Sequence, residues 1–142
     1  MQLLKWIKSN YFNILLFIII CLIISPVILS KPLNNLDEVW IYNFAKNIAD
    51  GLVPYRDFNL VITPLIAFIG GLFLKIFGNE LIIMRILAIL LISFMFFMTY
   101  QILNKLKINK YYNFAILFLL FLLLKEYICI FFNFFILAII LI

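Results

Sequence analysis

The sequence predicts an all-α, polytopic transmembrane protein. Of its 142 residues, 68% are hydrophobic and only 12% are charged, whereas a soluble domain uses roughly a quarter of its residues as charges. The hydrophobic residues are gathered in long uncharged runs whose lengths fit membrane-spanning helices. A soluble fold is therefore excluded, and the solvent around most of the chain is expected to be lipid.

The first uncharged run covers residues 9–30, and its 22 residues form a helix that crosses a hydrocarbon core of roughly 30 Å. No small-residue cleavage site closes this run, so we interpret it as a retained span and not as a secretory signal peptide. The predicted spans are about residues 10–30, 82–104, 111–124 and 127–142. Because the sequence ends inside the last apolar run, we expect it to be the front part of a longer membrane protein.

The connection between the first two spans, residues 31–81, holds every Asp and all but one of the Glu residues. Two short helices are predicted within it, at 36–50 and 64–77. The first has the spacing of a capping box at its start and a glycine after its end. The second is too short to cross a bilayer upright. We expect both to lie at the membrane surface as juxtamembrane helices.

The lysines indicate the orientation. If the second short helix lies at the surface, one side of the membrane receives the N-terminal lysines and the three lysines that follow the second span, which are Lys5, Lys8, Lys105, Lys107 and Lys110. Cytoplasmic loops carry the excess of lysine and arginine. The sequence therefore predicts a multi-pass protein of the cell membrane with a cytoplasmic N-terminus and an extracytoplasmic loop at 31–81.

Composition also removes several kinds of chemistry. The chain has no histidine, which excludes a histidine general base, a histidine-ligated zinc site and a Ser-His triad. Cys21 and Cys129 lie about a hundred residues apart in apolar runs, so neither a disulfide framework nor a Cys-x-x-Cys site is present. The net charge of +5 reflects membrane topology, and no nucleic-acid partner is expected.

Asp37 is the first candidate functional residue. It shares one stripe of the predicted helix 36–50 with Ile41, Phe44 and Ile48, so its carboxylate points toward the buried face. A desolvated carboxylate is stabilised by a cation, a metal or a hydrogen-bond donor. The alternative is that Asp37 and Glu38 only complement the dipole of the helix that they begin.

The other charged residues of the loop have structural interpretations as well. Arg56 and Asp57 fit a solvated pair within a loop. Lys75 and Arg85 flank the second short helix and the next span, where they would locate the lipid headgroups. Tyr55 would be an interfacial anchor. These interpretations stay open beside the functional ones.

Taken together, these motifs resemble a known family. The motifs are Leu36-Asp37-Glu38, Gly51, Pro54-Tyr55-Arg56-Asp57-Phe58, Pro64-Leu65, Phe77-Gly78 and Arg85. In this order and spacing they are similar to the N-terminal part of the GT-C membrane glycosyltransferases that use polyprenyl-phosphate sugars, such as protein O-mannosyltransferases and aminoarabinose transferases. The similarity covers about residues 10–110. The neighbourhoods Val39-Trp40-Ile41 and Thr63-Pro64 depart from the aminoarabinose branch, in which arginine and lysine occupy these places.

The resemblance implies a site in the extracytoplasmic loop. Asp37 resembles the catalytic carboxylate, which acts as a general base on the acceptor hydroxyl or, in some branches, helps to hold a divalent metal such as Mg or Mn; Glu38 would be its catalytic partner. Arg56 and Arg85 are assigned to the donor phosphate from its chemistry, with Tyr55 and Asp57 supporting the loop. The partners implied are a lipid-linked sugar donor, membrane lipids and a glycan, lipid or protein acceptor. Family members have about a dozen spans, so the fragment alone is expected to be inactive.

Two other classes of function remain. A small non-enzymatic membrane protein, or a fragment of a transporter, would use the loop carboxylates to bind a partner or an ion. A transporter is expected to place ionisable groups inside its spans, and none lies in 9–30 or 86–104. A sensor that binds a ligand in 31–85 is disfavoured because this stretch is too small to form a pocket alone.

Overall fold

A computed structural model of the chain describes residues 2–32, 36–61 and 64–124. This part of the chain is all-α, as the sequence predicts, and contains no strand. Its helices are α1 (Gln2–Leu29), α2 (Leu36–Ala49), α3 (Pro64–Phe77), α4 (Leu81–Lys105) and α5 (Lys110–Leu124). The two short helices expected in the loop are present within one residue of the expected bounds. The expected fourth span, 127–142, lies outside the described residues.

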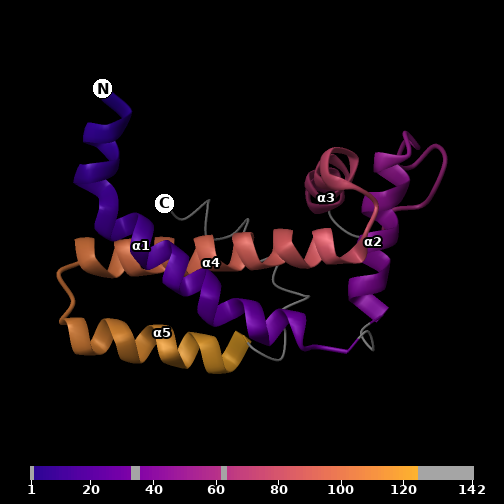
Figure 1. Cartoon of the computed structure of the whole chain (residues 1–142). Coiled ribbons are helices and arrows are strands. Elements are labelled where there is room, and N and C mark those ends of the chain that lie inside the picture. Colours follow the sequence, from indigo (N-terminus) through magenta and orange to yellow (C-terminus); the bar gives the residue numbers. More distant parts are fainter. Residues whose placement is uncertain (1, 33–35, 62–63, 125–142) are drawn as a thin grey trace.

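Two of these helices are long and apolar enough to cross a membrane, the segment Asn10–Leu29 of α1 and the whole of α4. They cross each other in the middle of the molecule (Figure 1). Ile24 and Ile28 of α1 are buried against Ile92 and Phe96 of α4. α5 runs back alongside α4 and adds Leu117, Leu120 and Phe121 to the same core.

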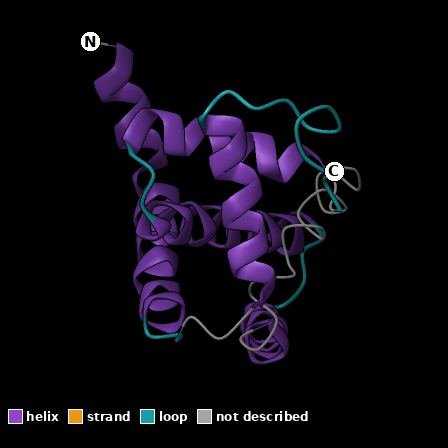
Figure 2. Cartoon of the chain, turned by 90° about the vertical axis from the view of Figure 1, so that its right-hand side faces the viewer, coloured by secondary structure: helices purple, strands orange, loops and turns teal. Residues whose placement is uncertain are grey.

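The helices α2 and α3 lie across the end of the molecule where α4 begins (Figure 1). Seen from that end, the two helices cross each other (Figure 2). Their contact is close because α3 presents Gly70 and Gly71 to Ala45 and Ile48 of α2. A second core of Ala45, Leu74, Met84 and Leu87 joins α2, α3 and α4.

The face of α3 that is turned away from this second core is also apolar. It exposes Leu65, Phe68, Leu72 and Ile76, which recur at steps of three and four residues. On α2, Asn43 is exposed, and the exposed Asp50 directly follows the last residue of the helix. A helix with apolar residues on two sides is usually buried on both sides. In α3, the described residues cover only one of these sides.

Candidate functional site

The candidate site lies where α1 ends and α2 and α4 begin. Glu38 is in the first turn of α2, and Arg85 is one turn inside α4. The Arg85 Nε donates to Glu38 Oε1 at 2.7 Å, and Nη2 donates to Oε2 at 3.2 Å. The remaining guanidinium nitrogen, Nη1, donates to the carbonyl oxygen of Leu29 at 3.3 Å. One arginine therefore links three helices.

This ion pair is partly withdrawn from solvent. The side chain of Arg85 is 12% exposed and that of Glu38 is 15% exposed. Its two parallel hydrogen bonds have the fork geometry in which a guanidinium matches a carboxylate. The last carbonyl groups of a helix have no partner within it, so the bond from Arg85 to Leu29 also satisfies one of the open carbonyls of α1.

Asp37 precedes Glu38 in the first turn of α2. It is half-buried at the start of the stripe that continues through Ile41, Phe44 and Ile48. Ile41 packs against the second core, Phe44 stacks on Phe58 at 6.1 Å between ring centroids, and Ile48 meets Gly71. The stripe is thus the face of α2 that contacts α3 and the loop, and Asp37 lies at the N-terminal end of this stripe.

Arg56 and Asp57 belong to a separate tight turn, Val53 to Phe58. The Asp57 carboxylate accepts from the backbone N–H of Val53 at 2.8 Å and from Arg56 Nε and Nη2 at 2.9 and 2.8 Å. Tyr55 has a φ of 65°, which is rare for a residue with a side chain, and its N–H donates to the carbonyl of Phe58. The side chain of Arg56 is 70% exposed.

The charges of this turn stabilise each other. The two hydrogen bonds from Arg56, together with the bond from the Val53 amide, hold the pKa of Asp57 below its ordinary value. The same contact raises the pKa of Arg56. The structure therefore gives the two candidate phosphate-binding arginines different partners: Arg85 is held by Glu38, and Arg56 is held by Asp57.

Two residues that sequence reasoning missed connect α2 to the turn before α4. The hydroxyl of Tyr42 donates to the carbonyl of Asn79 at 2.6 Å, and the side-chain amide of Asn79 donates to Asp50 at 3.3 Å. Tyr42 lies one turn after Glu38 on α2, so the two residues hold the same side of the helix to the start of α4. The i, i+4 spacing of two polar groups was the available signal.

A divalent metal does not fit the described residues on their own. They contain no group of three Asp, Glu, Cys or His side chains that could hold one. Both oxygens of Glu38 accept hydrogen bonds from Arg85, so the neighbour of Asp37 already has a cationic partner.

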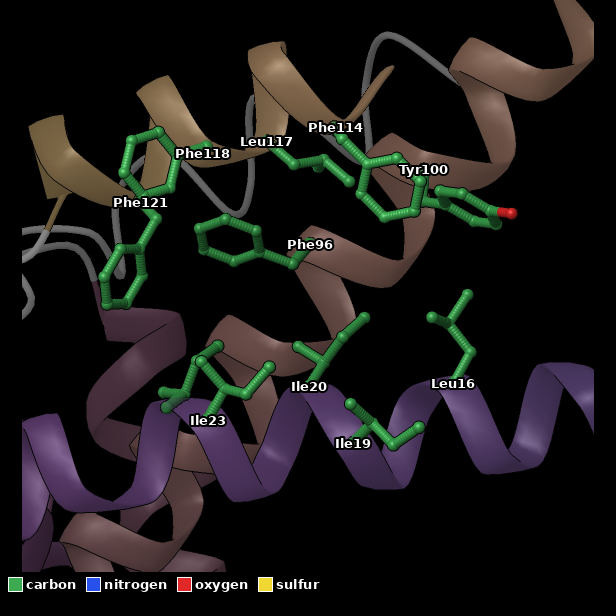
Figure 3. Close-up of a pocket in the computed structure, with 11 residues that line it drawn as sticks. Leu16, Ile19, Ile20, Ile23, Phe96, Tyr100, Phe114, Leu117, Phe118 and Phe121 are labelled. Atoms are coloured by element: carbon green, nitrogen blue, oxygen red, sulfur yellow. The ribbon is translucent and has the colours of Figure 1, made fainter. Parts of the chain in front are cut away.

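A groove between α1, α4 and α5 offers no chemistry of this kind. It encloses about 360 Å³ and is lined by aliphatic and aromatic side chains (Figure 3). Ile20 and Ile23 face it from α1, Phe96 from α4, and Leu117 and Phe121 from α5. A groove of this composition suits hydrocarbon and contributes no acid, base or cation.

Comparison of the chain with protein-family models, curated proteins and solved structures finds no match.

Proposed function

We propose that this chain belongs to an integral-membrane glycosyltransferase that moves a sugar from a polyprenyl phosphate to an acceptor hydroxyl on the extracytoplasmic side. The observation that carries the proposal is the partly buried Glu38–Arg85 pair. It holds a cation against the first turn of α2, which also contains Asp37, and this chemistry needs both a base and a cation.

The directions of the helices support the proposed placement in the membrane. If α1 and α4 cross the bilayer, α3 lies in its plane, because α3 runs across α4 (Figures 1 and 2). The exposed apolar side of α3 would then be covered by lipid, and Lys75 in its last turn would reach the headgroups. α2 and α3 would occupy one membrane surface, and the lysine-rich turn after α4 would occupy the other. The positive-inside rule assigns the lysine-rich side to the cytoplasm.

The proposed reaction begins at Asp37. Its carboxylate takes the proton of the acceptor hydroxyl while the acceptor oxygen forms a bond to the anomeric carbon of the sugar. The bond between that carbon and the phosphate oxygen breaks with its electron pair, so the polyprenyl phosphate leaves as an anion. Attack from the face opposite the leaving group inverts the anomeric centre.

Arg85 is the group proposed for the leaving phosphate. A guanidinium forms paired hydrogen bonds with phosphate as well as with carboxylate. Glu38 accepts from the Nε and Nη2 of Arg85 and so serves as a positioning residue for the cation, whose remaining N–H groups would contact the phosphate. Arg56 would be a second phosphate contact from the turn supported by Tyr55 and Asp57.

The test is the substitution Asp37→Asn in the intact protein in its native membrane. Transfer from a labelled polyprenyl-phosphate sugar should fall by roughly 10²-fold or more, the usual loss when a general base is removed. The matched control is Asp50→Asn, which removes a carboxylate of the same charge that has no role in the proposed site and should retain most transfer. Normal transfer by Asp37→Asn at normal membrane levels would refute the assignment of the base.

Sidedness is tested independently of transfer. In a variant with Cys21 and Cys129 replaced by alanine, a single cysteine at position 37 should react with an impermeant thiol reagent added from outside the cell. Reaction only from the cytoplasmic side would contradict an extracytoplasmic site. If labelling is external but neither donor nor acceptor is consumed by the parent protein, a non-enzymatic membrane protein becomes the better description.

A further inference from the structure

The turn between α4 and α5 carries a basic surface at the end of α4 opposite the candidate site. Lys105, Lys107 and Lys110 lie within six residues, and all three are exposed. The two ion pairs found among the described residues are Arg56–Asp57 and Arg85–Glu38, and neither includes one of these lysines. Every Asp and Glu between residues 2 and 124 lies in the stretch 37–80, at the other end of α4. The described part of the protein therefore does not neutralise this turn.

The backbone of the turn is held in place. Lys107 has a φ of 55°, and the N–H groups of Leu106 and Lys107 donate to the carbonyls of Ile102 and Asn104, both at 3.0 Å. Asn113 of α5 is 1% exposed, and its amide donates to the side chain of Asn104 at 2.9 Å. This bond joins the two helices directly behind the turn, so the lysines project from a fixed hairpin.

Two exposed tyrosines follow the lysines. Tyr111 and Tyr112 form the first turn of α5, and the Nζ of Lys110 lies 5.3 Å from the ring centroid of Tyr111. Tyrosine combines an apolar ring with a polar hydroxyl and is enriched at the level of lipid headgroups. Lysines beside such residues lie at the depth of the lipid phosphates.

We propose that the α4–α5 turn binds the phosphate headgroups of anionic phospholipids in the bilayer that holds the protein. The three ammonium groups suit phosphate as mobile point charges, and each lysine close to an anionic surface is worth about fivefold in lipid preference. The inference rests only on membrane insertion and not on sugar transfer, so loss of either function leaves the other measurable.

The experiment measures how strongly the chain in lipid nanodiscs prefers phosphatidylglycerol to phosphatidylcholine, by competition between labelled lipids at the protein surface. The unsubstituted chain should prefer phosphatidylglycerol by at least tenfold, and added salt should weaken this preference. The triple variant K105Q/K107Q/K110Q should lose most of it. The control K31Q/K46Q removes positive charge from the opposite end of α4 at two lysines with no proposed headgroup contact, and it should keep the preference.

A further variant separates charge from structure. K105R/K107R/K110R retains the charges and should retain the preference, and circular dichroism of each variant should show unchanged helix content. Equal preference in the parent and K105Q/K107Q/K110Q would overturn the proposal. An equal loss in the control would overturn it as well, because the preference would then follow net charge and not this turn. A chain that does not enter the bilayer would also contradict it.

Discussion

Glu38 and Arg85 are 47 positions apart in the sequence and meet through two hydrogen bonds of 2.7 and 3.2 Å. The pair closes a loop that begins at the end of α1 and returns at the start of α4. Arg85 also reaches the carbonyl of Leu29, so it fixes the ends of both long helices against α2. The cation proposed for phosphate binding is therefore also a structural link.

The first prediction concerns the strength of this link. Exposed ion pairs contribute about 0–1 kcal/mol, whereas removing one partner of a buried pair costs about 3–5 kcal/mol. Because the exposures of 12% and 15% lie between these cases, Glu38→Gln should lower the free energy of unfolding by roughly 1–3 kcal/mol. The measurement is chemical unfolding in detergent micelles followed by circular dichroism.

The control for this prediction is Arg56→Gln, which breaks the exposed ion pair of the Val53–Phe58 turn and should leave global unfolding almost unchanged. Arg85→Lys should resemble Glu38→Gln, because lysine keeps the charge but lacks the planar fork. Equal stability of Glu38→Gln and Arg56→Gln would mean that the partly buried pair adds nothing to the fold.

The helices of this protein could be predicted from local signals, and the contacts between them could not. Uncharged runs located α1 and α4, and Pro64 and Gly78 bounded α3. The pairing of Glu38 with Arg85 has no local signal, since it depends on how α2 crosses the start of α4. The sequence alone favours a dipole-compensating role for Glu38 and a headgroup-anchoring role for Arg85, and their contact appears only in three dimensions.

The second prediction concerns the glycines of α3. A Cβ on Gly71 would lie 2.8 Å from Ile48 Cγ2 and 3.0 Å from the carbonyl oxygen of Ala45. Overpacking of this kind costs about 1–3 kcal/mol, which exceeds the gain of up to about 1 kcal/mol from replacing a helical glycine by alanine. Gly71→Ala should therefore loosen α3 from α2, as measured by hydrogen exchange of the α3 amides.

Gly70→Ala provides the comparison at the neighbouring position. The three atoms nearest to its added Cβ are the Cβ of Ala45 at 2.9 Å and the Cε and Sδ of Met84 at 2.9 and 3.1 Å. The flexible end of Met84 can move aside, which leaves one fixed contact with α2, whereas Gly71 meets both the Cβ of Ile48 and the carbonyl of Ala45. Gly70→Ala should thus perturb exchange less than Gly71→Ala, and the reverse order would show that Met84 is held rigidly.

The third prediction is a pH dependence of the Val53–Phe58 turn. Because the pKa of Asp57 is lowered by Arg56 and by the Val53 amide, the carboxylate stabilises the turn at every pH above its ordinary value of 3.8. This contribution is lost as the pH falls through the lower pKa of the folded state. The amide resonance of Val53 should therefore titrate with a midpoint below 3.8.

Two variants check the cause of this shift. Arg56→Gln removes the larger contribution and should move the midpoint up toward the ordinary value, while Asp57→Asn should abolish the titration. A midpoint that Arg56→Gln leaves unchanged would show that the backbone amide alone accounts for the lowered pKa.

The last prediction concerns the polar contact between the two long helices. The amide of Gln101 on α4 donates to Asn13 on α1 at 3.0 Å, and the pair is partly buried among apolar side chains. Such bonds between helices in a bilayer average about 0.6 kcal/mol and reach about 1.7 kcal/mol. A double-mutant cycle of Asn13→Ala and Gln101→Ala, followed by unfolding in bilayer-like micelles, should give a coupling of this size.

A cycle of Ser25→Ala and Gln101→Ala is the control, because Ser25 bonds to the carbonyl of Leu22 in its own helix and its coupling should be close to zero. Zero coupling between Asn13 and Gln101 as well would mean that apolar packing at Ile24, Ile28, Ile92 and Phe96 alone holds the crossing of α1 and α4.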